Sequence, residues 1–168
     1  YNNAFNVNAD KVVNNSLDNN IFWASWYNYY RVIKQANAVI KFTPQVLEAG
    51  GISAEKADDV MGQAYCLRAF TYFWIIRIWG DAPLVTAPYL DSNDSFDLPK
   101  AAVADIVEQI HSDLENASNM IDKNSTSRTT FTQTAAYAIN AHVYAWEHKY
   151  EETINMADKV LTNTNYTL

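Results

Sequence analysis

The fold is decided by residues 61–85, MGQAYCLRAFTYFWIIRIWGDAPLV, which form an almost continuous apolar run. Two opposite faces of a helix through this run are apolar. One face carries Val60, Ala64, Leu67, Thr71, Trp74 and Ile78, and the other carries Tyr65, Ala69, Tyr72, Phe73, Ile76 and Trp79. A helix that is apolar all round is buried on both sides, so we expect this one to lie between neighbouring helices. Gly80 supplies its C-terminal stop, and Pro83 prevents continuation.

A helix is predicted before this one. Its apolar side chains recur at steps of three and four residues, which is the period of one helical face: Phe22, Trp26, Tyr29, Ile33, Ala36 and Ile40. We expect this helix to end near Pro44. Gly50 and Gly51 then break the chain, and Ser53 opens the central helix.

Three helices are predicted after the central one. Pro99 fits the first turn of a helix whose apolar stripe is Val103, Ile106, Val107, Ile110, Leu114, Ala117 and Ile121. Thr132 is suited to cap the next helix, and the last begins near Tyr150. The sequence therefore predicts an all-α fold of antiparallel helical hairpins. We expect one unit over residues 1–168, with an irregular surface segment at 1–20 and helices over 22–168.

Composition excludes several classes of protein. The formal charge of −7 argues against a nucleic-acid partner, because phosphate binding requires clustered Lys and Arg. The longest apolar run, Ala69 to Trp79, is interrupted by Arg77 and is too short to cross a bilayer. Cys66 is the only cysteine and lies in an apolar run, so we expect a small core residue. The chain lacks an initiator Met, and we expect it to be a fragment of a longer protein.

No pattern in the chain predicts catalysis, a cofactor or a metal site. The spacing of Asp91, Asn93, Ser95 and Asp97 is that of the first half of a calcium loop, but Phe96 replaces the required Gly and Ala102 replaces the required Glu. A polar loop is therefore the favoured interpretation of residues 91–97. The intervals between His111, His142 and His148 match no zinc signature. We interpret His148 and the neighbouring Glu147 as a solvated pair.

The first predicted helix carries more aromatic residues than one buried face can hold. Trp23, Trp26, Tyr27, Tyr29 and Tyr30 cannot all face the core from a single helix, so some are exposed or meet another chain. Exposed aromatic rings anchor protein interfaces or stack on sugar rings. Burial against other helices remains the alternative for each of them.

Three stretches of the sequence together resemble the signatures of one known family. The aromatic helix Trp23–Ile40 leads to the pair Ala36-Asn37, which resembles the first signature of that family. Residues 62–85 resemble the second and most diagnostic signature of the family. The matching residues are Leu67, Arg68, Ala69, Tyr72, Phe73, Trp79, Gly80, Pro83, Leu84 and Val85. The helix from Ile106, with Ile110, Asp113, Leu114 and Ala117 in register, resembles the third signature. The family that these stretches resemble is SusD/RagB, the surface glycan-binding lipoproteins of Bacteroidetes.

A fourth block and a helical repeat extend the resemblance. Ser127-Arg128-Thr129-Thr130 resembles the family's Gly-Arg-x-Thr block, with Ser127 in place of Gly. Residues 138–161 independently fit a tetratricopeptide-like helix pair, through Ala141, Tyr144, Tyr150 and Ala157. The resemblance thus implies a tetratricopeptide-like helical scaffold, of which this chain is the N-terminal portion.

The resemblance also implies a function. Such a protein is an exported lipoprotein of the outer membrane, attached through a lipid anchor, that binds an oligosaccharide or another nutrient and hands it to a SusC-like TonB-dependent porin. It is not an enzyme and needs no cofactor. Loop placement, rather than any motif, selects the candidate ligand contacts Tyr1, Asn3, Phe5, Tyr89 and Asn93.

Two other functions stay open. One is a tetratricopeptide adaptor that binds a peptide in a groove lined by Tyr137, Asn140 and Tyr144. The other is a helical glycosidase, which would need paired carboxylates at a cleft.

Overall fold

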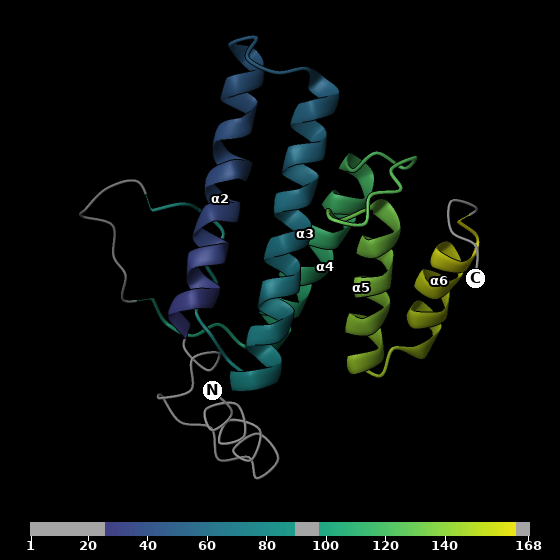
Figure 1. Ribbon diagram of the computed structural model, residues 1–168. Helices are drawn as coiled ribbons and strands as arrows, with labels where there is room; N and C mark the ends of the chain where they lie inside the picture. The colour runs from purple at the N-terminus through teal and green to yellow at the C-terminus, as the bar shows by residue number, and fades with distance from the viewer. Residues whose placement is uncertain (1–25, 90–97, 164–168) are drawn as a thin grey trace, which may run out of the picture.

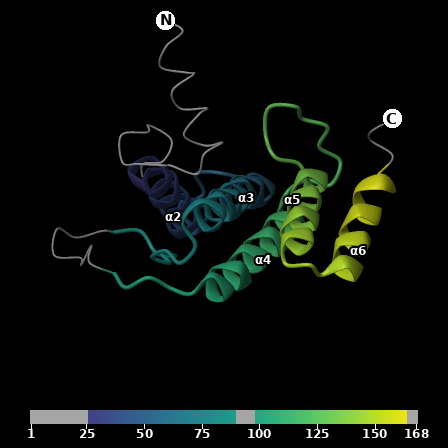
Figure 2. The same ribbon diagram turned by 90° about the horizontal axis from the view of Figure 1, so that it is seen from below.

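The computed structural model describes residues 26–89 and 98–163. Its helices are α2 (Trp26–Glu48), α3 (Ala54–Trp79), α4 (Val103–Met120), α5 (Gln133–Trp146) and α6 (Tyr150–Leu161). Figures 1 and 2 show them as a row in chain order, from α2 at one side to α6 at the other. Each helix packs against the next one in the sequence. Over the described ranges the only strand-like pairing is a bridge between Ala82 and Ala101, so the predicted all-α class is confirmed.

The predicted caps set the ends of the helices. Ser53 accepts a hydrogen bond from the backbone N–H of Lys56 at 3.2 Å and begins α3. Thr132 accepts one from Ala135 at 3.1 Å and begins α5. Gly80 ends α3 with a φ of 72°, a conformation that residues with a Cβ rarely adopt. These boundaries follow from local chemistry.

Two predicted boundaries at prolines are wrong. Helix α2 runs through Pro44 to Glu48, because Pro44 is exposed and water can reach the carbonyl that loses its donor. Helix α4 begins at Val103 rather than at Pro99. Ala101 is held extended by its hydrogen bonds with Ala82, at 2.9 and 3.3 Å, and the side chain of Asp81 accepts from the N–H of Val103 at 2.9 Å. The start of α4 is therefore set by residues far away in the sequence.

The core lies where α3 packs against α2 on one side and α4 on the other. Its largest fully buried side chains include Ile33 of α2, Tyr72 and Ile75 of α3, and Ile110 of α4. The predicted α4 stripe is buried at Ile106, Val107, Ile110, Leu114, Ala117 and Ile121. Cys66 is fully buried, as predicted, and burial raises the pKa of its thiol to about 12.

The prediction that α3 lies between neighbouring helices is confirmed, because it packs against both α2 and α4. The prediction that its whole apolar surface is buried is wrong for the described residues. Leu67, Phe70 and Trp74 keep 38%, 37% and 41% of their surface exposed. Helices α2 and α4 cover much of α3, and α5 barely touches it, so the part of its surface that carries these three side chains is left open. The sequence pattern reports that a face is apolar, but only the arrangement of neighbours decides whether it is covered.

Candidate functional site

Residues 83–87, here called the clamped segment, follow α3 and are held by side chains of α2 and α3. The Asn37 Nδ2 donates to the carbonyls of Val85 at 3.0 Å and Ala87 at 3.2 Å. The Tyr30 hydroxyl donates to the carbonyl of Pro83 at 2.6 Å. Because these contacts go to the main chain, they fix the path of the segment whatever its side chains are.

Tyr72 supplies a further clamp. Its hydroxyl lies 2.7 Å from the N–H of Val85, from which it accepts, and 3.1 Å from the carbonyl of Val85, to which it donates. Burial raises the pKa of Tyr72 above its usual value, so the hydroxyl stays neutral and keeps the proton that it donates. Burial likewise raises the pKa of Tyr30.

A buried ion pair lies beneath the clamp. Arg68 donates from Nε and Nη2 to the two carboxylate oxygens of Asp113 at 2.7 and 2.6 Å, and from Nη1 to Asn37 at 2.7 Å and the carbonyl of Thr86 at 3.2 Å. Gln109 adds a third donor to Asp113 at 2.8 Å. Burial raises the pKa of the Asp113 carboxyl, and these hydrogen bonds oppose the rise. The pair joins α2, α3 and α4 to the clamped segment.

The clamp leads directly to one predicted contact residue. Tyr89 follows the clamped segment, is half-buried and packs against the core. The bridge between Ala82 and Ala101 joins the two chain segments that flank residues 90–97. The other predicted contacts, Tyr1, Asn3, Phe5 and Asn93, lie outside the described residues. So do the predicted polar loop and possible calcium ligands, Asp91, Asn93, Ser95 and Asp97.

A second polar cluster joins α4 to the end of α5. The Nε2 of His111 lies 2.6 Å from a carboxylate oxygen of Glu147, and its Nδ1 lies 2.7 Å from the amide oxygen of Asn140. Lys149 contacts the other oxygen of Glu147 at 2.8 Å. Burial raises the pKa of Glu147, but the hydrogen bonds from Lys149 and His111 outweigh burial and hold it below its usual value.

The predicted pairing of Glu147 with His148 is therefore wrong. His148 has a φ of 63° in the turn between α5 and α6, and its Nδ1 lies 3.1 Å from the hydroxyl of Tyr150. His111, 36 positions away in the sequence, takes its place beside Glu147. Within the ranges that the structure describes, no three His, Cys, Asp or Glu side chains are grouped to hold a metal ion.

The side chains proposed for a peptide groove are engaged within the chain. Asn140 is buried beside His111. The ring of Tyr144 stacks on His111 at 4.1 Å between centroids, and the Nζ of Lys159 lies 4.9 Å from the centre of the Tyr137 ring. These contacts tie α5 to α4 and α6.

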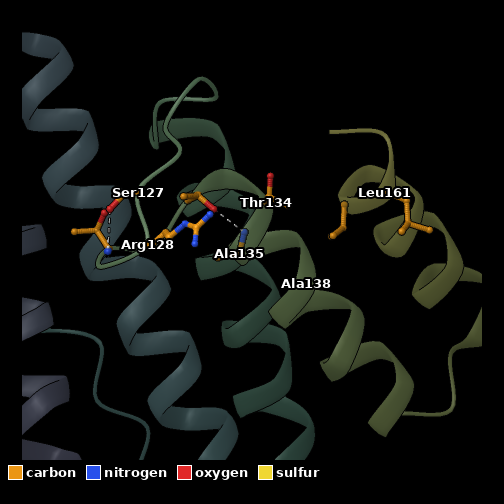
Figure 3. Close-up of a pocket in the computed structure, with 9 residues that line it drawn as sticks. Ser127, Arg128, Thr134, Ala135, Ala138 and Leu161 are labelled. Carbon is orange, nitrogen blue, oxygen red and sulfur yellow. Dashed lines mark hydrogen bonds between the residues drawn. The ribbon is translucent and has the colours of Figure 1, made fainter. Parts of the chain in front are cut away.

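A pocket of about 420 Å³ lies between the start of α5 and the end of α6. Figure 3 shows Ala135 and Ala138 on one wall, Leu161 across from them, and Ser127 and Arg128 at the edge. The hydroxyl of Ser127 accepts from the N–H groups of residues 129 and 130 at 3.3 and 3.2 Å. The pocket is thus mainly an apolar gap between two helices, with polar groups at its edge.

The sequence alone did not predict the buried polar network of Arg68, Asp113 and Asn37 that holds the clamped segment. A signal was available, because Arg68 and Asp113 each interrupt an apolar stripe, and a buried charge requires a partner. Arg68 and Asp113 could not be paired from the sequence, since 45 positions separate them.

No helix among the described residues is long and apolar enough to cross a membrane.

Comparison with known proteins identifies the family to which the chain is similar. A family model described as "Starch-binding associating with outer membrane" matches residues 1–145. Two relatives from Formosa agariphila, SusD-like proteins P38 and P2, are 27% and 30% identical over 96% and 91% of this chain. The matches cover 32% and 30% of those proteins, so the chain spans about a third of their length.

Solved structures share the fold. A SusD superfamily protein from Bacteroides vulgatus superposes with a TM-score of 0.80 at 26% identity, over 91% of this chain and 33% of its own. A structure solved with a xylogluco-oligosaccharide gives a TM-score of 0.76 at 26% identity, over 90% of this chain and 31% of its own. Both larger proteins therefore contain a part that folds like this helical row.

Proposed function

The chain belongs to the SusD-like family of starch-binding proteins that associate with the outer membrane, and from this premise we propose that the protein binds an oligosaccharide at the cell surface without transforming it. The observation that carries the proposal is the match to the structure solved with a xylogluco-oligosaccharide, over 90% of this chain. The relatives are about three times longer, so the proposal concerns the whole protein.

The described helices would serve as the rigid support of the binding site. Preorganised contacts bind better than mobile ones because less conformational freedom is lost on binding. The buried Arg68 to Asp113 pair and the clamp on residues 83–87 provide that rigidity beside Tyr89. Tyr89 and Asn93, with Tyr1, Asn3 and Phe5, remain the proposed contacts, through ring stacking and amide hydrogen bonds.

Delivery of the glycan is the finer part of the proposal. A SusC-like TonB-dependent porin would receive the oligosaccharide, and a lipid anchor outside residues 1–168 would hold the protein at the outer membrane. The support is the resemblance of the sequence signatures to this family. Co-purification of the porin with the tagged protein from detergent-solubilised outer membranes is expected, and a preparation free of any porin would contradict the partnership.

Binding can be measured by isothermal titration calorimetry of the whole protein with xyloglucan oligosaccharides and with maltoheptaose. We expect one of these glycans to bind and to be recovered unchanged by chromatography. Replacing all five proposed contacts with alanine should weaken binding at least tenfold, which is about 1.4 kcal/mol. Circular dichroism should verify that the variant is folded.

Two controls separate the possible failures. Tyr137→Ala, on α5, should leave glycan affinity unchanged, whereas a peptide adaptor would be affected at that position. Unchanged affinity of the five-alanine variant would refute the choice of contacts. Absence of binding to a full glycan array by the wild-type protein would refute glycan binding itself.

A further inference from the structure

The ring of His111 on α4 lies between two oxygen atoms that belong to α5 and its end. Its Nδ1 lies 2.7 Å from the amide oxygen of Asn140, and its Nε2 lies 2.6 Å from a carboxylate oxygen of Glu147, the residue that caps α5. The side chain of His111 is only 18% exposed, and Asn140 is buried. Both contacts are therefore largely shielded from water.

The two oxygen atoms beside the ring can only accept hydrogen bonds at neutral pH. Burial raises the pKa of Glu147, but hydrogen bonds from Lys149 and His111 outweigh burial and hold that pKa below its usual value, so the carboxyl group is ionised. An ionised carboxylate and an amide oxygen carry no proton to donate. Both ring nitrogens of His111 then have to donate. A neutral imidazole has one N–H, whereas the imidazolium cation has two.

We infer that His111 is held as an imidazolium cation and that its second proton controls how tightly the end of α5 is joined to α4. Loss of that proton leaves a bare ring nitrogen facing an oxygen atom, so one of the two hydrogen bonds across the joint is lost. Histidine side chains change their charge between about pH 5 and 8. The joint should thus be tight in mild acid and weaker above neutral pH. This inference is independent of glycan binding.

The surroundings of the ring suit a cation. The ring of Tyr144 stacks on His111 at 4.1 Å between centroids, and charged groups from three elements act on that pair. Among the described residues, the titratable groups around the ring are Glu108 and Glu115 on α4, Tyr144 and Glu147 at the end of α5, Lys149 in the turn, and Glu152 on α6. Four carboxylates thus face one ammonium group, and that ammonium is paired with Glu147 at 2.8 Å.

The position of the cluster decides what the proton can change. Helix α5 packs against α4 and α6 but barely touches α3, so α4 is the main support of the α5–α6 hairpin. At the other end of α5, the Nε2 of Gln133 donates to the carbonyl of Ser118 at 2.7 Å. That contact involves no titratable group and persists when His111 loses its proton. The hairpin should therefore loosen at the end of α5 and stay attached at its start.

NMR spectroscopy of the full-length protein with ¹⁵N-labelled histidine tests the protonation state. The signals of His111 are identified by their loss in His111→Gln. We expect protons on both of its ring nitrogens at pH 6, and the loss of one of them as the pH is raised to 9. His142→Gln removes an exposed histidine of α5 and is the matched control, in which the signals of His111 should be unchanged.

Hydrogen exchange of the full-length protein, followed by mass spectrometry, tests the joint. After correction for the intrinsic effect of pH, residues 141–149 should exchange about tenfold faster at pH 8 than at pH 6, because a hydrogen bond to a charged group is lost. Helix α2 should show no such difference. The difference should disappear in His111→Gln and persist in His142→Gln, and circular dichroism should verify that both variants are folded.

A second variant changes the charge beside the ring and keeps its shape. Asn140→Asp gives the ring a second carboxylate, so His111 should keep both protons to higher pH and the exchange difference should shrink. A single ring proton on His111 at pH 6 in the wild-type protein would overturn the assignment of the cation. Equal corrected exchange at pH 6 and pH 8 would overturn the proton-dependent joint, and so would a difference that persists in folded His111→Gln.

Discussion

Removal of one member of the buried ion pair should cost far more stability than removal of a similar pair at the surface. Arg68 is 3% exposed and Asp113 is fully buried. Asp113→Leu keeps a comparable volume but leaves the guanidinium without two of its hydrogen bonds. Breaking a buried pair in this way costs about 3–5 kcal/mol, out of a total stability of about 5–15 kcal/mol for a domain.

The double variant makes the reasoning quantitative. Arg68→Met with Asp113→Leu removes both charges, so no buried charge is left unpaired. The buried amide oxygen of Asn37 still loses a donor, at a cost of about 1–3 kcal/mol, whereas Thr86 is exposed and water can replace the donor to its carbonyl. We therefore expect the double variant to be more stable than Asp113→Leu, with a strong positive coupling between the two sites.

Urea unfolding at pH 7, followed by tryptophan fluorescence, measures these differences. The control is Lys56→Ala, which breaks an exposed pair with Asp59 at 2.9 Å and should cost less than about 1 kcal/mol. A cost for Asp113→Leu no larger than that of the control would refute the claim that burial gives the pair its importance. Arg68→Met is measured as the second single variant, and a loss in the double variant equal to the sum of the losses in Arg68→Met and Asp113→Leu would refute the coupling.

Four other substitutions test separate parts of the structure. Hydrogen bonds from two basic partners outweigh burial and hold the pKa of Glu147 below its usual value, so its stabilisation is present at neutral pH and is lost as the pH falls through that lowered pKa. Wild type should thus lose about 1 kcal/mol more than Glu147→Gln between pH 7 and pH 3, as measured by urea unfolding; parallel pH profiles would contradict this. Tyr72→Phe removes the hydroxyl that holds the clamped segment, and should cost about 1–3 kcal/mol and speed hydrogen exchange there; unchanged exchange would contradict it. Gly62→Ala places a Cβ 2.7 Å from a side-chain carbon of Ile121 and should lower stability by about 1–3 kcal/mol. Gly50→Ala meets nothing within 4 Å and should cost about 1 kcal/mol, for its φ of +71°; a larger loss at Gly50 than at Gly62 would reverse this reasoning.

Features that depend on neighbours in the sequence were predicted well. The caps at Ser53 and Thr132 and the stop at Gly80 each involve atoms within four residues. The α4 stripe follows from helical period alone. The family signatures also lie in these helices, which explains why the family could be identified from the sequence.

Features that depend on distant residues could not be predicted. The start of α4 is set by Asp81 and Ala82, about twenty positions earlier. The partner of Glu147 is His111 rather than its neighbour His148, because the turn after α5 directs the adjacent ring elsewhere. Most of the predicted ligand contacts lie outside the described residues and remain predictions.

The sequence of residues 61–85 by itself determined a long apolar helix, its stop at Gly80 and its family signature, because helical period and backbone conformation are local properties. Tertiary structure alone decided which sides of that helix are covered. Helices α2 and α4 bury one part of its surface and pair Arg68 with Asp113, while Leu67, Phe70 and Trp74 are left open. Burial is a relation between elements, and it is settled only when those elements are placed in space.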